Sequence, residues 1–251
     1  MNKQDVTILH HGRVIKGSLL LPVEGEKCPL VIMSHGYNGS GAGFEKLADY
    51  LAQNGIGAFY YDFCGGSVNA KSSMETTSMT IFTEKEDLCA VLETVKNWSF
   101  ADQDNIYLFG ESQGGLVSTL VAREHENDIN GMLLLYPALC IADNWNERFA
   151  TVDDIPDEFE LWGMKLGKKF FTTLRDFRTF EAIGRFEKDV FVMHGDMDSV
   201  VPLSYSQKLI NLYSHARLEV FTGEGHGFSE EAYNRVCRIT ADFIHKVSAA
   251  K

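Results

Sequence analysis

The sequence lacks the cysteine pattern of a disulfide framework or a metal site. Its five cysteines are an odd number and stand far apart, at Cys28, Cys64, Cys89, Cys140 and Cys237. A structural zinc site needs closely spaced pairs of ligands, and no such spacing occurs here. We therefore expect reduced thiols in an intracellular protein, with no metal ion and no other cofactor.

Long apolar runs are also missing. The longest, Met132–Ala142, is interrupted by Pro137 and is much shorter than the roughly 20 residues that cross a bilayer as a helix. The residues after Met1 contain too few apolar positions for the central segment of a secretory signal. These absences predict a cytoplasmic protein that does not contact a membrane.

Basic residues are scarce. There are 23 Lys and Arg residues against 35 Asp and Glu residues, which gives a net charge of −12. No stripe of Lys and Arg is present to follow a phosphate backbone, so the sequence predicts no nucleic-acid partner. The glycine pairs also lack the lysine spacing of a phosphate-binding loop. The partner that remains is a small-molecule substrate, and nothing in the sequence indicates the oligomeric state.

Strand and helix patterns alternate along the chain. After an N-terminal hairpin that turns at 10–13, apolar strands are expected at 30–33, 56–61, 106–109, 131–136, 190–193 and 218–221. Amphipathic helices fall between most of them, which predicts an α/β fold with a mostly parallel central sheet flanked by helices. No repeat, low-complexity tract or linker divides the chain, so we expect a single domain over 1–251.

One of these helices carries a candidate capping box. Thr83 and Glu86 have the spacing at which a hydroxyl and a carboxylate satisfy the first free N–H groups of a helix. A shared apolar face follows, formed by Leu88, Val91, Leu92 and Val95. The pattern therefore predicts that this helix starts at Thr83.

Residues 138–189 differ in composition from the rest of the chain. Aromatic residues alternate with charges there without one long period, which predicts an inserted cap of short helices and irregular connections within the domain. The aromatic residues are Trp145, Phe149, Phe159, Trp162, Phe170, Phe171, Phe177 and Phe180. For each of them, Trp162 included, a place in the core of the cap is the simpler interpretation, and Trp162 is the residue we name as the candidate substrate contact.

A serine stands at the turn between one predicted strand and the next helix. Gly110-Glu111-Ser112-Gln113-Gly114 fits the pattern G-x-S-x-G, with an apolar strand before it and helical spacing of Leu and Val after it. At such a turn the serine takes a strained conformation that exposes its Oγ at the end of the sheet. The flanking glycines are needed because strand and helix pass too close for a Cβ. We predict that Ser112 is a nucleophile.

The nucleophile needs a base and an acid. A serine hydroxyl is activated by a histidine that a carboxylate orients, and in this architecture they follow in the order serine, acid, histidine. Asp198 and Asp196 compete for the acid, and Asp198 is favoured because it lies deeper in the loop, whereas Asp196 is better placed to cap turn amides. His226, between two glycines just past a strand, is the candidate base.

Two backbone amides are expected to stabilise the oxyanion of the tetrahedral intermediate. One is the N–H of Gln113, at the start of the helix that follows the serine, where the helix dipole assists. The other is the N–H of Tyr37, in the glycine-rich loop that follows the strand at 30–33.

Four segments together resemble the α/β-hydrolase superfamily: His35-Gly36, the G-x-S-x-G turn, Gly195–Pro202 and Gly225-His226-Gly227. Within it, the Gly-x-Ser-Gln-Gly-Gly sequence, the insert that opens after Tyr136-Pro137-Ala138, and Ile155–Glu158 resemble the bacterial cinnamoyl/feruloyl esterase group.

The resemblance implies that Ser112, Asp198 and His226 are the triad and that Tyr37 and Gln113 form the oxyanion hole. It also implies that the insert is a lid over the acyl pocket. One loop departs from the group. Many of its members have a histidine after the fourth strand, whereas this chain has Phe63-Cys64-Gly65-Gly66-Ser67.

The expected function is a serine carboxylesterase that hydrolyses carboxylic esters through an acyl-enzyme. The resemblance extends this to hydroxycinnamate (feruloyl-type) esters. A short-chain aliphatic esterase, a thioesterase or a peptidase would use the same triad, so these alternatives stay open. A different class of function, a catalytically silent ligand-binding homologue, would be expected to have lost a triad residue, and none is lost here.

Overall fold

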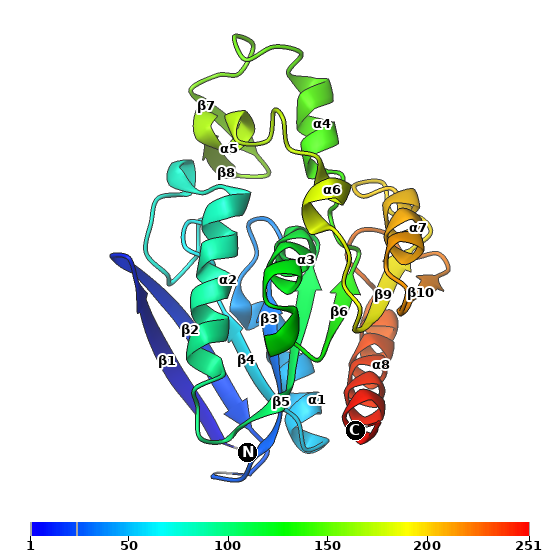
Figure 1. The fold of residues 1–251 in the computed structure, drawn as a ribbon. Coiled ribbons are helices and arrows are strands. Elements are labelled where there is room, and N and C mark those ends of the chain that lie inside the picture. The colour runs from blue at the N-terminus through cyan, green and yellow to red at the C-terminus, as the bar shows by residue number, and fades with distance from the viewer. Residues whose placement is uncertain (1, 24, 251) are drawn as a thin grey trace.

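A sheet of eight strands runs through the centre of the molecule (Figure 1). The computed structural model describes residues 2–23 and 25–250. In sheet order the strands are β1 (Asn2–His10), β2 (Arg13–Leu21), β4 (Gly57–Tyr61), β3 (Cys28–Ser34), β5 (Ala101–Glu111), β6 (Gly131–Leu135), β9 (Asp189–Gly195) and β10 (Ala216–Phe221). The pairs β1–β2 and β2–β4 are antiparallel, and every other neighbouring pair is parallel.

Helices cover both faces of the sheet. One face packs against α1 (Glu45–Gln53) and α8 (Glu230–Ala249), and the other against α2 (Ile81–Val95), α3 (Gln113–Glu124) and α7 (Leu203–Leu212). Short 3-10 helices lie in connections, at Gly41–Phe44, Thr76–Ser78 and Glu126–Asp128. The predicted mostly parallel sheet with flanking helices is confirmed, and so is the N-terminal hairpin. At the start of α8, Ser229 Oγ accepts the Ala232 N–H.

The central strands are apolar on both sides because both sides are buried. In β5, Ile106 and Leu108 pack toward α2 and α3, whereas Tyr107 and Phe109 pack toward α1 and α8. All four side chains are at most 1% exposed. This is why the strands appear in the sequence as continuous apolar runs and not as alternating ones.

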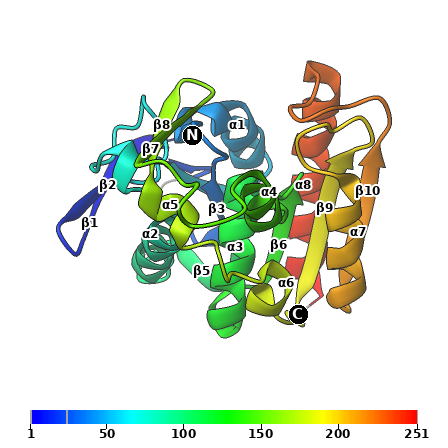
Figure 2. The same ribbon diagram turned by 90° about the horizontal axis from the view of Figure 1, so that it is seen from above.

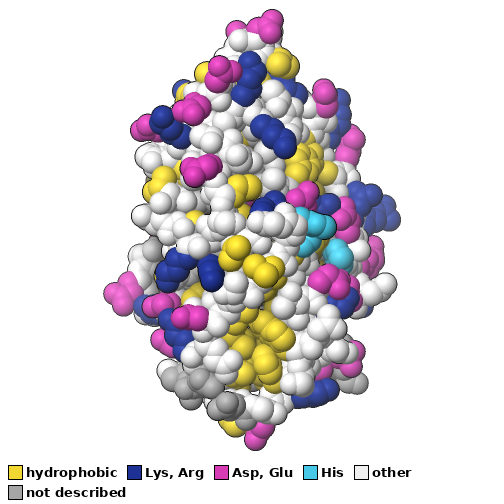
Figure 3. Space-filling model, turned by 90° about the vertical axis from the view of Figure 1, so that its left-hand side faces the viewer, with side chains coloured by type: hydrophobic (Ala, Val, Ile, Leu, Met, Phe, Trp, Pro, Cys, Tyr) yellow, Lys and Arg dark blue, Asp and Glu magenta, His cyan; other side chains and the backbone are white. Residues whose placement is uncertain are grey.

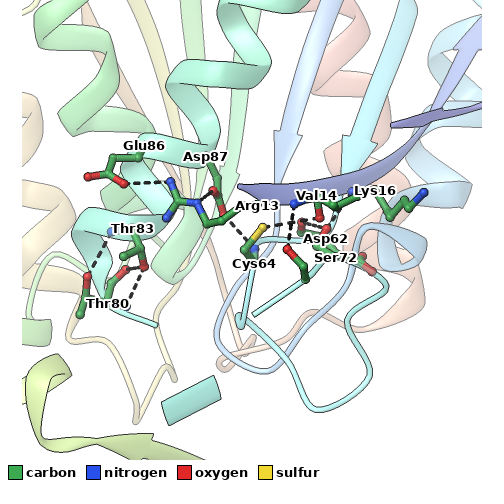
Figure 4. Close-up of polar contacts among 11 residues, drawn as sticks. Arg13, Val14, Lys16, Asp62, Cys64, Ser72, Thr80, Thr83, Glu86 and Asp87 are labelled. Carbon is green, nitrogen blue, oxygen red and sulfur yellow. Dashed lines mark hydrogen bonds and ion pairs between the residues drawn. The ribbon is translucent and has the colours of Figure 1, made fainter. Parts of the chain in front are cut away.

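The predicted start of α2 is wrong. Thr80, not Thr83, is the N-cap: its Oγ1 accepts the Thr83 N–H, while Thr83 Oγ1 accepts the Thr80 N–H (Figure 4). Glu86 is directed instead toward Arg13 of β2, at 2.8 Å. The helix therefore begins earlier than expected, and Glu86 joins it to the N-terminal hairpin.

The segment between β6 and β9 rises above the carboxyl ends of the strands (Figure 1). We call residues 138–189 the cap segment. It contains α4 (Ile141–Arg148), α5 (Lys168–Thr172), α6 (Thr179–Ile183) and a hairpin of β7 (Glu158–Leu161) and β8 (Met164–Gly167). The hairpin was not expected from the sequence. Seen from above, β7, β8 and α5 lie toward the β1–β2 side of the sheet (Figure 2).

The cap segment has its own aromatic cluster. The rings of Trp145 and Phe149 are stacked, and Phe171 meets both edge-on at centroid distances of 4.8 and 5.3 Å. Phe159 and Phe170 complete the contacts. This cluster accounts for most of the aromatic residues that distinguish the segment in the sequence.

The surface carries mixed charge. On the face that shows the N-terminal hairpin, Lys and Arg side chains are interspersed with Asp and Glu (Figure 3). The five cysteines are unpaired, and four of them are buried. Among the described residues, no helix combines the length and the apolar character that a membrane span requires.

Candidate active site

Ser112 lies at the sharp turn between β5 and α3. Its φ of 51° and ψ of −116° are a strained combination for a residue with a side chain, at a cost of about 1–3 kcal/mol. Close packing requires the flanking glycines. A Cβ on Gly114 would lie 2.2 Å from the carbonyl oxygen of Ser34, and one on Gly110 would lie 2.6 Å from that of Gly114. The predicted strain and the need for small neighbours are both confirmed.

His226 meets Ser112 from the loop that follows β10. Its Nε2 lies 2.9 Å from Ser112 Oγ. The ring also contacts Tyr136, with ring centroids 4.6 Å apart. Tyr136 itself is fixed by donating its hydroxyl to Glu111 Oε1 at 2.9 Å. The imidazole is therefore held against the serine by a packed aromatic side chain.

Asp198 completes a chain of hydrogen bonds. Its Oδ2 accepts from His226 Nδ1 at 2.8 Å, and its Oδ1 accepts the N–H groups of Val200 and Val201 at 2.9 and 2.8 Å. Burial alone would raise the pKa of Asp198, but hydrogen bonds from His194, His226 and the Val201 amide hold that pKa well below its usual range. The carboxylate therefore stays charged and can orient the imidazole. The structure thus brings all three predicted residues together.

Asp196 lies apart from this chain. Its Oδ1 accepts the N–H of Gly223 at 2.7 Å, which is the turn-capping role expected from its position. The two aspartates of one loop therefore face different partners.

The loop after β3 passes directly over Ser112. A Cβ on Gly36 would lie 3.0 Å from the Ser112 Cβ, so no side chain fits there and the next residue, Tyr37, is brought to the serine. Tyr37, Ser112 and Gln113 line one cavity. No acceptor for the backbone N–H of Tyr37 or Gln113 is found among the described residues. Both amides are therefore available to an oxyanion.

The cavity has a volume of about 330 Å³ and lies between the sheet and the cap segment. Its wall is largely apolar, and its residues come from the loops around Ser112 and from α4, β7, β8 and α5. They include Tyr37, Ala138, Ile141, Trp145, Leu161, Leu166, Phe170, Val200 and Val201. A cavity of this size and character suits a small apolar or aromatic group next to the serine.

Trp162 lies at the mouth of this cavity, in the two-residue turn of the β7–β8 hairpin. Its side chain is 63% exposed, and its ring meets Tyr37 at a centroid distance of 6.0 Å. Both turn residues have positive φ, 48° for Trp162 and 76° for Gly163, as a type I′ hairpin turn requires. Trp162 thus lies where a ligand entering the cavity would touch it.

The hairpin is joined to the loop after β3. The Tyr37 hydroxyl donates to the carbonyl oxygens of Leu161 and Met164 at 3.0 and 3.2 Å, and Asn38 Nδ2 donates to the Trp162 carbonyl at 3.1 Å. The loop that supplies one predicted oxyanion amide therefore also supports the cap segment. No sequence pattern indicates this connection, because the hairpin itself was not expected.

The loop after β4 supports the loop after β3 from the other side. His35 accepts the Phe63 N–H at its Nε2 and donates from Nδ1 to the Gly36 carbonyl, at 3.0 and 2.7 Å. These partners fix a neutral imidazole, and burial lowers its pKa. Asp62 adds a second connection by accepting the Gly41 N–H at 2.8 Å.

The same loop is anchored to the N-terminal hairpin. Ser72 Oγ donates to the Asp62 carbonyl at 2.6 Å and accepts the Lys16 N–H at 2.8 Å (Figure 4). The segment Phe63–Ser67, which departs from the resembled group, has a structural role here, because its Phe63 N–H donates to His35 and its Gly66 carbonyl accepts the Asn38 N–H.

Sequence reasoning missed one buried acid near the serine. Glu84 Oε2 accepts from Gln113 Nε2 at 2.8 Å, and the Glu84 side chain is 1% exposed. Burial raises the pKa of Glu84 to about 8. In the sequence it is an ordinary glutamate in the first turn of a helix.

Three comparisons place the chain among known proteins. A family model described as serine aminopeptidase, S33, matches residues 25–178. A structure of Est1E from Butyrivibrio proteoclasticus with ferulic acid bound is 26% identical and has a TM-score of 0.87, with 97% of this chain and 99% of that chain covered.

Two further matches are to an acyl transferase and a lipase. An acyl transferase of Vibrio harveyi is 29% identical over 187 residues, which are 68% of this chain and 58% of the length of that protein. A monoacylglycerol lipase of Paleococcus ferrophilus is 17% identical with a TM-score of 0.68, covering 93% of this chain and 98% of that chain. At that identity the likeness shows the fold alone.

Proposed function

The chain belongs to the family described as serine aminopeptidase, S33, within the α/β-hydrolases, and from this premise we propose that it is a serine carboxylesterase. The observation that carries the proposal is the continuous chain of hydrogen bonds from Ser112 through His226 to Asp198 at the base of a cavity. The hydrolase family and the likeness to Est1E support it.

In the proposed reaction Ser112 Oγ attacks the ester carbonyl while His226 Nε2 takes its proton. The negative charge on the carbonyl oxygen is stabilised by the N–H groups of Tyr37 and Gln113, the latter at the positive end of the α3 dipole. His226 then gives the proton to the leaving alcohol, and an acyl-enzyme remains. Water, deprotonated by His226, then attacks the acyl-enzyme; the acid leaves, His226 returns the proton to Ser112 Oγ, and Asp198 keeps the imidazole oriented throughout.

Replacing the nucleophile tests this mechanism. We expect Ser112→Ala to lower kcat for p-nitrophenyl acetate by several orders of magnitude and to abolish covalent labelling by a fluorophosphonate probe. Ser199→Ala is the matched control, since Ser199 lines the same cavity outside the hydrogen-bond chain, and it should keep activity within a few-fold. Near wild-type hydrolysis by Ser112→Ala would refute the proposal. An intact protein that the probe fails to label would favour a silent ligand-binding homologue.

For the acyl group we propose hydroxycinnamate esters. Aromatic residues from the loop after β3 and from the cap segment line the cavity, namely Tyr37, Trp145, Trp162 and Phe170. Est1E, a structural relative, has been seen with ferulic acid bound. On this reading the cap segment is a lid over the acyl group and Trp162 is a substrate contact.

A comparison of substrates tests this assignment. We expect kcat/KM for methyl ferulate to exceed that for methyl butyrate by at least tenfold, because an aromatic acyl group buries more apolar surface in the cavity. Trp162→Ala should weaken the preference. Preference for the aliphatic ester would reject the hydroxycinnamate assignment and leave the esterase mechanism untouched.

Acyl transfer is the second candidate, because a relative from Vibrio harveyi is an acyl transferase. The same acyl-enzyme would then pass its acyl group to an alcohol or thiol in place of water. Adding an alcohol acceptor to the ester assay distinguishes the two: a transferase forms a new ester in large excess over the free acid.

A further inference from the structure

The buried carboxyl group of Glu84 contacts the side chain of Gln113, the residue that follows the nucleophile Ser112. Glu84 is in the first turn of α2, and its Oε2 accepts from Gln113 Nε2 at 2.8 Å. The two side chains are 1% and 2% exposed. The contact joins α2 to the first residue of α3, whose backbone N–H is one of the two proposed oxyanion donors.

No positive charge compensates this carboxyl group. Among the described residues, no Lys, Arg or His forms an ion pair with Glu84. Arg13, the nearby cation, is engaged by Asp87 at 3.2 Å and Glu86 at 2.8 Å (Figure 4).

The remaining titratable neighbours do not favour a charge either. Asp87 lies one turn further along α2 and raises the pKa of Glu84 by repulsion, after burial, which is the larger cause. Tyr61 of β4 and His35 after β3 are both buried, and the imidazole is fixed as neutral by its two hydrogen bonds. A Cβ on Gly66 would lie 3.1 Å from His35 and 3.2 Å from Glu84 Oε1, so the loop after β4 closes the space between them.

An ionised carboxylate is unstable in such a place. Burying an unpaired charge costs far more than burying a neutral carboxyl group that accepts one hydrogen bond from an amide. The environment therefore selects the protonated form around neutral pH. Because Glu84 is buried, a negative charge formed on it would be poorly screened by solvent and would repel the developing oxyanion.

We propose that Glu84 is a positioning residue that holds Gln113 in place and supports catalysis only in its neutral form. Its hydrogen bond to the Gln113 side chain fixes the first residue of α3, so that the backbone N–H of Gln113 points toward the oxyanion. Its neutrality keeps a buried negative charge away from the site where the transition state develops one. The inference rests on the proposed role of Ser112 as nucleophile and adds a group that controls the alkaline side of the pH profile.

The pH profile of three variants tests this role. We expect wild-type kcat for methyl ferulate or p-nitrophenyl acetate to fall severalfold between pH 7 and pH 9.5, with a midpoint near the Glu84 pKa of about 8. Glu84→Gln, which keeps an acceptor for Gln113 but cannot ionise, should remove this fall when each profile is scaled to its own maximum. Glu86→Gln, a change at an exposed position on the same helix, should retain the wild-type fall.

A third variant separates positioning from charge. Glu84→Leu is also neutral, but it leaves the side-chain amide of Gln113 without its acceptor. Its kcat at pH 7 should therefore lie at least tenfold below that of Glu84→Gln, with a similar KM. Circular dichroism melting confirms that each variant is folded at the assay temperature. Asp87 does not confuse the result, since its pKa, which burial raises to about 6, lies below the range tested.

The outcomes are distinct. If wild type and Glu84→Gln lose activity in parallel above pH 8, Glu84 does not control the alkaline side, and the inference is overturned. Equal kcat values for Glu84→Gln and Glu84→Leu at pH 7 would overturn the positioning role. In both cases labelling of Ser112 by a fluorophosphonate shows that the proposed mechanism itself still holds.

Discussion

At the scale of single residues, the choice between two aspartates shows what the geometry adds to the pattern. Asp198 and Asp196 stand two positions apart in one loop, and both fit a loose sequence pattern. Only Asp198 reaches His226, while the two backbone amides on its other oxygen fix the direction of that bond. Asp196 instead closes a turn with Gly223. Position in the loop was a sufficient guide because the deeper residue faces the site.

The two aspartates therefore make a matched pair of variants. We expect Asp198→Asn to lower kcat for p-nitrophenyl acetate by about 10³–10⁴-fold, because a neutral amide cannot stabilise the imidazolium and its NH₂ group can hold His226 in the wrong tautomer. Asp196→Asn should cost less than about threefold, since an amide oxygen can still accept the Gly223 N–H. Steady-state kinetics at pH 7.5 measures both. Similar losses in the two variants would contradict the assignment of the acid.

Glu84 could not be identified from the sequence. A glutamate in the first turn of a helix is common, because it interacts favourably with the helix dipole. Its significance comes from Gln113, which lies 29 residues away. Ser112, Asp198 and His226 could be predicted from the sequence because each follows a strand and lies in a loop with a recognisable sequence pattern. A buried side chain on a helix face has no comparable local signal.

At the scale of elements, the central strands and helices could be predicted because burial on both faces leaves a strong pattern. The expected strand at 30–33 is observed as β3, and the one at 131–136 as β6, with ends that differ by a few residues. The start of α2 was misplaced because Thr80 and Thr83 both have suitable partners three positions on. Local spacing alone does not decide between two such caps, whereas the pairing of Glu86 with Arg13 does.

The β7–β8 hairpin was missed for a physical reason. Its strands are four residues each, and β7 alternates exposed and half-buried side chains, so the apolar signal is short and weak. Its turn places Trp162 at a positive φ, a position that favours Asn, Asp or Gly. Only Gly163 carries the usual sequence signal of such a turn. The strained tryptophan and the hydrogen bonds from Tyr37 place this hairpin at the entrance of the cavity.

At the scale of the whole molecule, three buried acids make the stability of the fold depend on pH, two in one direction and one in the other. Burial raises the pKa of Asp87 to about 6 and that of Glu84 to about 8, whereas the partners of Asp198 hold its pKa well below the usual range. An acid whose pKa is raised in the folded state stabilises the fold at low pH and loses that contribution as the pH rises through the folded value. An acid whose pKa is lowered stabilises the fold above its unfolded pKa and loses the contribution only in strong acid.

The raised pKa values of Glu84 and Asp87 predict that the folded protein loses stability as the pH rises above neutral. Between pH 6 and pH 9 we expect the free energy of unfolding to fall by a few kcal/mol, since one pKa unit corresponds to about 1.4 kcal/mol and Glu84 must ionise inside the fold. The net charge of −12 adds self-repulsion in the same direction. Urea unfolding at pH 6, 7.5 and 9 measures the loss, and in Glu84→Gln most of it should disappear, while Glu86→Gln should behave as the wild type. An equal loss in wild type and Glu84→Gln would show that Glu84 is not neutral in the folded protein at pH 6.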